Sequence, residues 1–176
     1  ALRSECERVS KGQGLPVDQR IDALPAGVAP AVTVCLFRVA QEALANAVKH
    51  GDAGHISVDL TGGPSSVSLT ITDDGPGFPP QLIGRIGDPF VRSRARPEGA
   101  DPARAHYDGM GMGLFIAKTL LERTGADLDF SNASDPFLSE EDRQARSGAR
   151  VQVQWPLDRI AADAASLSGS NQPMRL

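Results

Sequence analysis

The chain has 176 residues, of which 40% are hydrophobic and 23% are charged. These values are typical of one globular domain and exclude a multidomain chain, a fibrous repeat and wholesale disorder. The formal net charge of -4 provides no basic field for a polyphosphate backbone, so nucleic acid is not an expected partner. The two cysteines, Cys6 and Cys35, exclude a disulfide scaffold and a zinc knuckle.

The apolar runs of the sequence are short. The longest, such as residues 29–37, fall short of the ~20 residues that a bilayer span requires, and no basic-then-apolar leader opens the chain. We therefore expect a cytoplasmic fragment without membrane contact of its own, from a parent that can itself be membrane-anchored. The chain begins at Ala1 rather than Met, which indicates a domain excised from a longer protein.

The first half of the sequence predicts two helices and three strands. Residues 2–9 resemble the end of a helix that the following glycines break, and residues 17–23 form a short strand. Residues 30–50 have the apolar spacing of a long helix, closed by a glycine. Residues 56–60 and 67–72 alternate on either side of Gly-Gly-Pro, which predicts a hairpin and hence antiparallel pairing.

The second half begins with a long segment without periodicity, residues 73–113, which is rich in Gly, Pro and Arg. A loop of this length is typical of a functional lid or of misassigned elements. A second helix is predicted from 113 to 124, two strands at 127–130 and 150–155, and a disordered tail from residue 161. The alternation of helices and hairpins favours an α+β layer sandwich over a doubly wound parallel sheet.

One face of the predicted helix 30–50 carries polar side chains. At about 100° per residue, Glu42, Asn46 and Lys49 lie together, opposite the apolar side. A solvated face with ordinary ion pairs is the simplest interpretation. Asn46 is the exception, because asparagine is a mediocre helix former. Amide and carboxylate oxygens are ligands of Mg²⁺ together with substrate phosphates, so a metal site is the alternative.

Two glycine-containing motifs follow. In Asp73-Asp74-Gly75-Pro76-Gly77, a tight turn and a ligand site are both open. As a site, Asp73 would present a carboxylate to an amino group, and the glycines would let a flat ligand approach the backbone.

The second motif, Gly109-Met110-Gly111-Met112-Gly113, opens the predicted second helix. Backbone amides at a helix N-terminus favour an anion, so a phosphate site is the natural inference, with a flexible hinge as the alternative.

Three motifs resemble, in chain order, the N, G1 and G2 boxes of the GHKL ATP-binding superfamily. They are Glu42-x-x-x-Asn46, Asp73-x-Gly75-x-Gly77 and Gly109-x-Gly111-x-Gly113. The resemblance implies a Bergerat-type α+β fold, a two-layer sandwich of a mixed, largely antiparallel sheet with about three helices on one face. The segment GMGMGLFIAKTLLERTGA is similar to the RegB/PrrB redox-responsive class of sensor histidine kinases, and the N box is similar to the NarX/DesK class. The domain would span residues 15–158 with a lid at about 78–108, after a helix remnant at 1–14 and before a disordered tail at 159–176.

The resemblance also implies ATP and Mg²⁺ as cofactors and gives residues roles. Asn46 would coordinate Mg²⁺, Lys49 would neutralise phosphate charge, and Asp73 would accept a hydrogen bond from the adenine amino group. Glu42 would be the catalytic base. The other implied cofactor-binding residues are His50, which would pack beside the base or cap its helix, Gly75, Gly77, Phe90 as the lid anchor, Gly109, Gly111, Gly113 and Leu114.

The implied reaction is phosphoryl transfer to a histidine. The partners would be the dimerisation and phosphoacceptor domain of a homodimeric parent and, downstream, a response regulator. None of the three histidines, His50, His55 and His106, lies in a phosphoacceptor context, so the chain alone should not autophosphorylate. A GHKL-type ATPase, an anti-sigma-type serine kinase and a nucleotide-binding module without turnover remain alternatives.

Overall fold

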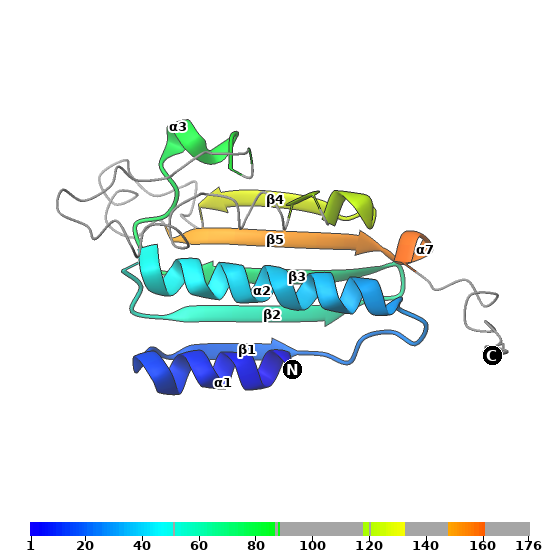
Figure 1. Cartoon of the computed structure of the whole chain (residues 1–176), viewed down its shortest axis with the longest axis horizontal. Helices are drawn as coiled ribbons and strands as arrows, with labels where there is room; N and C mark the ends of the chain where they lie inside the picture. Colours follow the sequence, from blue (N-terminus) through cyan, green and yellow to red (C-terminus); the bar gives the residue numbers. More distant parts are fainter. Residues whose placement is uncertain (51, 87, 89–117, 120, 133–147, 161–176) are drawn as a thin grey trace, which may run out of the picture.

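The fold is built on one five-stranded sheet in the strand order β1-β2-β3-β5-β4 (Figure 1). The computed structural model describes residues 1–50, 52–86, 88, 118–119, 121–132 and 148–160. The strands are β1 (Val17–Ile21), β2 (Ile56–Gly62), β3 (Ser66–Asp73), β4 (Asp127–Asn132) and β5 (Ala149–Pro156). β1 is parallel to β2, and the other neighbouring pairs are antiparallel. This confirms the mixed, largely antiparallel sheet.

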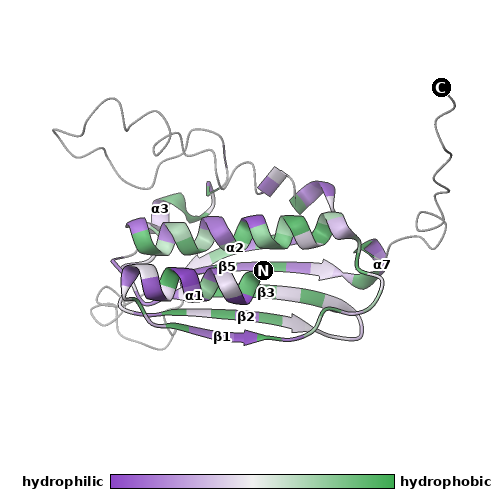
Figure 2. Cartoon of the chain, turned by 60° about the horizontal axis from the view of Figure 1, so that its bottom comes forward, coloured by the Kyte–Doolittle hydropathy of each residue, from purple (hydrophilic) through white to green (hydrophobic). Residues whose placement is uncertain are grey.

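Two long helices cover one face of the sheet. They are α1 (Leu2–Gln13), which lies along β1, and α2 (Pro30–His50), which lies over β2 and β3 (Figures 1 and 2). α2 connects β1 to β2, so it returns the chain to the end of the sheet where β1 began. That crossover is why these two strands are parallel while the hairpin between β2 and β3 is antiparallel.

The core lies between α2 and the sheet. Alternate residues of β2, β3 and β5 point into it and are buried: Ile56, Val58, Leu60, Val67, Leu69, Ile71, Val151, Val153 and Trp155. The intervening residues are polar, as in an antiparallel sheet with one solvated face. α2 is long and apolar enough to qualify as a membrane span by length and composition. In this fold it is a core helix, because its buried residues pack in the same cluster as the strands.

The structure corrects three details of the sequence-based assignment. α1 continues through Gly12 and ends before Gly14, which adopts the left-handed conformation (φ 65°) that glycine tolerates at a helix end. The first strand ends at Ile21, since the following chain crosses over Gly62 and leaves the sheet. Two short helices were not expected: α3 (Pro80–Ile83) and α7 (Leu157–Ile160).

Candidate functional site

A buried carboxylate marks one edge of the sheet. Asp73 ends β3 and is 8% exposed. Its Oδ1 accepts hydrogen bonds from the backbone N–H of Gly75 at 2.9 Å and of Ala149 at 3.1 Å. Both bonds go to the same oxygen, and no donor among the described residues occupies Oδ2, which can therefore accept from a ligand. The two donors lie in the turn after β3 and at the start of β5, and the carboxylate therefore joins two segments that are distant in the sequence.

The pKa of Asp73 is raised. Burial is the main cause, and the neighbouring Asp74 acts in the same direction, while the N–H groups of Ala149 and Gly75 partly offset it. A carboxylate that has lost water on burial is stabilised by any further donor that reaches it. The arrangement therefore suits a neutral ligand with an N–H group, such as an exocyclic amine.

Gly148 makes the arrangement sterically possible. It has a positive φ of 46°, and a Cβ at this position would lie 2.0 Å from the carbonyl oxygen of Asp73. Its N–H donates to the carbonyl oxygen of Gly75 at 2.8 Å. The sequence predicted a strand at 150–155 but assigned no role to Gly148. The only signal was a glycine directly before a strand.

The polar face of α2 reaches the same edge of the sheet, where the helix ends and β3 ends (Figure 1). The side chain of Asn46 is partly buried, and its Nδ2 lies 3.5 Å from Oε1 of Glu42. This contact directs the amide nitrogen toward Glu42 and leaves the amide oxygen for another partner. Lys49 is exposed one turn further on and has an interaction of its own. Of His50 only the backbone is described.

The structure thus brings together part of the site expected from the sequence. Asp73 ends β3, and the buried Gly75 and then Gly77 follow it in the turn. Glu42 and Asn46 lie on α2, which ends on the same side of the sheet (Figure 1). The expected phosphate loop and lid anchor lie outside the described residues, as does most of the lid at 78–108: Phe90, Gly109, Gly111, Gly113 and Leu114.

Asn132 is a site-edge residue that sequence reasoning missed. Its Oδ1 accepts from the N–H of Phe78 at 2.7 Å, and its Nδ2 donates to the carbonyl oxygen of Phe78 at 2.9 Å. The ring of Phe78 also makes an edge-to-face contact with Phe130, with ring centroids 6.0 Å apart. These contacts attach the chain after Gly77 to the end of β4. An asparagine at a strand end was the only sequence signal.

The residues that the structure describes offer few ligands for a metal ion. The described part of the chain contains no group of three or more His, Cys, Asp or Glu side chains suited to a metal ion. The oxygen of Asn46 fits Mg²⁺, which commonly takes few protein ligands and completes its octahedron with phosphates and water. The donor set therefore suits a metal that arrives with a phosphorylated ligand and does not suit a permanently bound transition metal.

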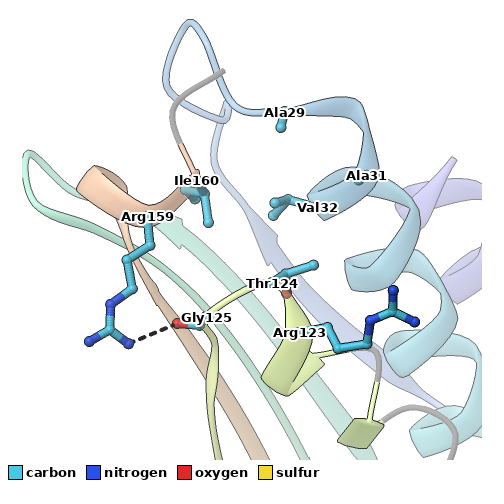
Figure 3. Close-up of a pocket in the computed structure, with 8 residues that line it drawn as sticks. All are labelled: Ala29, Ala31, Val32, Arg123, Thr124, Gly125, Arg159 and Ile160. Carbon is cyan, nitrogen blue, oxygen red and sulfur yellow. Dashed lines mark hydrogen bonds between the residues drawn. The ribbon is translucent and has the colours of Figure 1, made fainter. Parts of the chain in front are cut away.

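A cavity of about 440 Å³ lies elsewhere, at the beginning of α2 (Figure 3). Val32, Ile160 and Arg123 are among its lining residues, and Nη1 of Arg159 donates to the carbonyl oxygen of Gly125 at 3.4 Å on its rim. At 1.5 Å per residue, the start of α2 is about 20 Å from Asn46. The cavity is therefore separate from the buried carboxylate and belongs to the opposite end of the sheet.

Comparison with known proteins identifies the fold. The sequence profile described as "Histidine kinase-, DNA gyrase B-, and HSP90-like ATPase" matches residues 31–159. The chain belongs to this family. Sensor histidine kinase RegB of Cereibacter sphaeroides is 60% identical over 94 residues, which are 53% of this chain and 20% of RegB. Nitrate/nitrite sensor protein NarX of Escherichia coli is 34% identical over 98 residues, 54% of this chain and 16% of NarX. The chain thus spans about a fifth or less of these relatives.

Solved histidine kinases share the architecture of this ATPase-family chain. The mycobacterial sensor histidine kinase MprB superposes with a TM-score of 0.63 at 25% identity and covers 88% of this chain and 92% of its own. Full-length ShkA in complex with AMPPNP has a TM-score of 0.65 at 21% identity, covering 93% of this chain and 30% of ShkA. The match to 92% of the MprB chain, together with the match to RegB, identifies the catalytic domain of sensor histidine kinases.

Gly148→Ala tests the steric role of Gly148 in this domain. The added methyl would meet the Asp73 carbonyl in a conformation that alanine rarely adopts, so the free energy of unfolding should fall by about 2 kcal/mol or more. Urea denaturation measures the change. Gly84→Ala is the matched control, since a Cβ there has open space and φ is negative. Equal stability of the two variants would contradict the packing derived for Gly148.

Asp73→Asn tests the buried charge. Because the folded pKa is raised, the native carboxyl keeps a proton that the unfolded chain has lost. Stability therefore falls as the pH rises from the ordinary carboxyl range through the raised pKa. The amide variant lacks this loss, so its free energy of unfolding relative to the wild type should increase with pH. Urea denaturation between about pH 3 and 7 measures the difference, in which other carboxylates cancel. If the difference in the free energy of unfolding between Asp73→Asn and the wild type did not change with pH, the raised pKa of Asp73 would be contradicted.

Proposed function

We propose that this chain binds Mg·ATP and positions it for phosphoryl transfer to a histidine on a separate dimerisation domain. The observation that carries the proposal is the buried Asp73, whose Oδ1 is occupied by two backbone N–H groups and whose Oδ2 is left to accept from the adenine amino group. Guanine has a carbonyl oxygen at the corresponding position, which a carboxylate would repel. The site should therefore select adenine nucleotides.

The residues at the end of α2 supply the charge and the metal ligand. Asn46 would hold Mg²⁺ through its amide oxygen, and the metal when bound neutralises phosphate charge. Lys49, exposed on the same face, would contribute a positive charge toward the phosphates. Glu42 would orient the amide of Asn46 through the contact seen in the structure and would accept the proton of the attacking group.

The remaining assignments extend this proposal. Residues 15–158 would form the nucleotide-binding unit, with a lid at about 78–108 anchored by Phe90. His50 would pack beside the base, and Gly109, Gly111, Gly113 and Leu114 would provide phosphate-binding amides. The partners would be the phosphoacceptor domain of a homodimeric parent and a response regulator, and the domain would act in the cytoplasm. RegB and NarX, sensor proteins by their names, support this setting.

Isothermal titration calorimetry tests nucleotide recognition. The chain should bind Mg·ATP with micromolar to millimolar affinity and GTP far more weakly. Asp73→Asn should weaken ATP binding at least about tenfold, because the amide oxygen keeps the bonds from Gly75 and Ala149 and the NH2 group, a donor, then faces the adenine amine. Asn46→Asp should weaken ATP mainly when Mg²⁺ is present. Asp59→Asn, on the solvated face of β2, is the control and should bind as the wild type does. Equal binding of ATP and GTP would overturn the role of Asp73.

Labelling with [γ-³²P]ATP separates the kinase from a hydrolase. The isolated chain should neither acquire acid-labile phosphate nor release phosphate rapidly. A dimerisation fragment of the parent protein should become labelled when it is added. Glu42→Gln should slow that labelling more than it weakens ATP binding, because a base acts in the transition state. Brisk hydrolysis by the chain alone would favour the ATPase class. Self-labelling at His50 or His106 would contradict the expectation that the chain lacks a phosphoacceptor histidine.

A further inference from the structure

A second carboxylate, that of Asp74, connects the turn after β3 to the loop between α2 and β2. Asp74 follows the buried Asp73, but its side chain turns to the loop between α2 and β2. Its Oδ1 accepts from the backbone N–H of Gly54 at 2.7 Å and from that of His55 at 2.9 Å. Its own N–H donates to the carbonyl oxygen of His55 at 3.2 Å. Three hydrogen bonds thus join the turn after β3 to the chain that leaves α2.

The loop held by Asp74 has an unusual backbone. Asp52 has a positive φ of 44°, and no other described residue apart from glycine has one. Such a conformation persists only when its surroundings hold it. The hydrogen bonds at Gly54 and His55 follow two and three residues later and fix the path of the loop into β2. They lie four and five residues after the end of α2, so they join the chain that follows this helix to the turn after β3.

The two adjacent carboxylates have opposite electrostatic environments. Burial raises the pKa of Asp73. Asp74 is exposed, and although its slight burial opposes ionisation, the N–H groups of His55 and Gly54 outweigh it and lower the pKa of its carboxyl. Asp74 is thus held as an anion by backbone donors, while Asp73 has an oxygen left for a ligand.

We infer that Asp74 is a positioning residue that holds the Asn46 and Lys49 end of α2 at a set distance from the adenine-binding carboxylate of Asp73. This inference rests on the proposed nucleotide site. A nucleotide must contact Asp73 through its base and α2 through its phosphates and metal at the same time. Loss of the Asp74 contacts leaves Asp73 bound to Gly75 and Ala149 but releases the loop that places α2.

The inference predicts a selective defect. Asp74→Ala should weaken Mg·ATP about tenfold, since two hydrogen bonds to a charged acceptor are lost, and should leave the weak binding of adenosine within about twofold. Asp74→Asn should restore Mg·ATP binding, because a single oxygen accepts both bonds and an amide oxygen can do the same. Calorimetry measures Mg·ATP, and NMR titration measures adenosine.

Two further variants separate the loss of the Asp74 hydrogen bonds from a general loss of folding. Asp74→Glu keeps the charge but lengthens the side chain by one methylene, so its oxygen no longer lies where the N–H groups of Gly54 and His55 both donate to it, and it should share the selective defect. Asp18→Asn is the matched control, because Oδ2 of Asp18 on β1 lies 3.0 Å from Nε2 of His55 and so contacts the same loop from another side. It should bind Mg·ATP as the wild type does.

Amide hydrogen exchange provides a readout without nucleotide. Exchange at Gly54 and His55 should accelerate in Asp74→Ala and Asp74→Glu and stay slow in Asp74→Asn. Faster exchange with unchanged Mg·ATP affinity would overturn the inference, as would equal losses for Mg·ATP and adenosine. Failure of the wild type to bind Mg·ATP would instead overturn the proposed function.

Discussion

The site depends on one buried carboxylate that is held by the backbone on both sides. Asp73 at the end of β3 accepts from Gly75, two residues later, and from Ala149, which begins β5. An ionised carboxylate loses much of its hydration on burial and is stable only where donors replace the water. One of these donors is the N–H of Ala149 at the start of β5, so the carboxylate gains this bond only when β5 takes its place beside β3.

The hydrogen bond between Asp73 and Ala149 constrains the backbone at Gly148, directly before Ala149. The backbone before Ala149 must pass over the carbonyl of Asp73, at a distance where even a methyl group does not fit. Only glycine satisfies this approach with a positive φ, and Gly148 is that residue. Tight backbone packing in turn prevents the carboxylate from rotating away from its donors. A rigid acceptor lowers the cost of ordering the site when a ligand binds.

α2 serves the core and the site with opposite faces. Its apolar residues are buried against β2 and β3, and its polar residues Glu42 and Asn46 lie near the edge where β3 ends. Burial fixes the rotation of the helix, and the Asp74 contacts with the next loop hold its end. The apolar face thereby determines where Asn46 and Lys49 lie, which we propose as the metal ligand and the phosphate-binding cation.

The sequence by itself determined the element types, the polar face of α2 and the three motifs, because helical and strand periodicity and glycine spacing are local properties of the chain. The resemblance to the GHKL superfamily rested on those motifs, and the family match confirmed it. Local pattern could not show that Gly148 packs on Asp73, that Asn132 binds the backbone of Phe78, or that Asp74 holds the loop after α2. Each of these contacts joins residues 19 or more positions apart. Only the tertiary structure decided them, because they depend on which strands become neighbours and how closely their backbones approach.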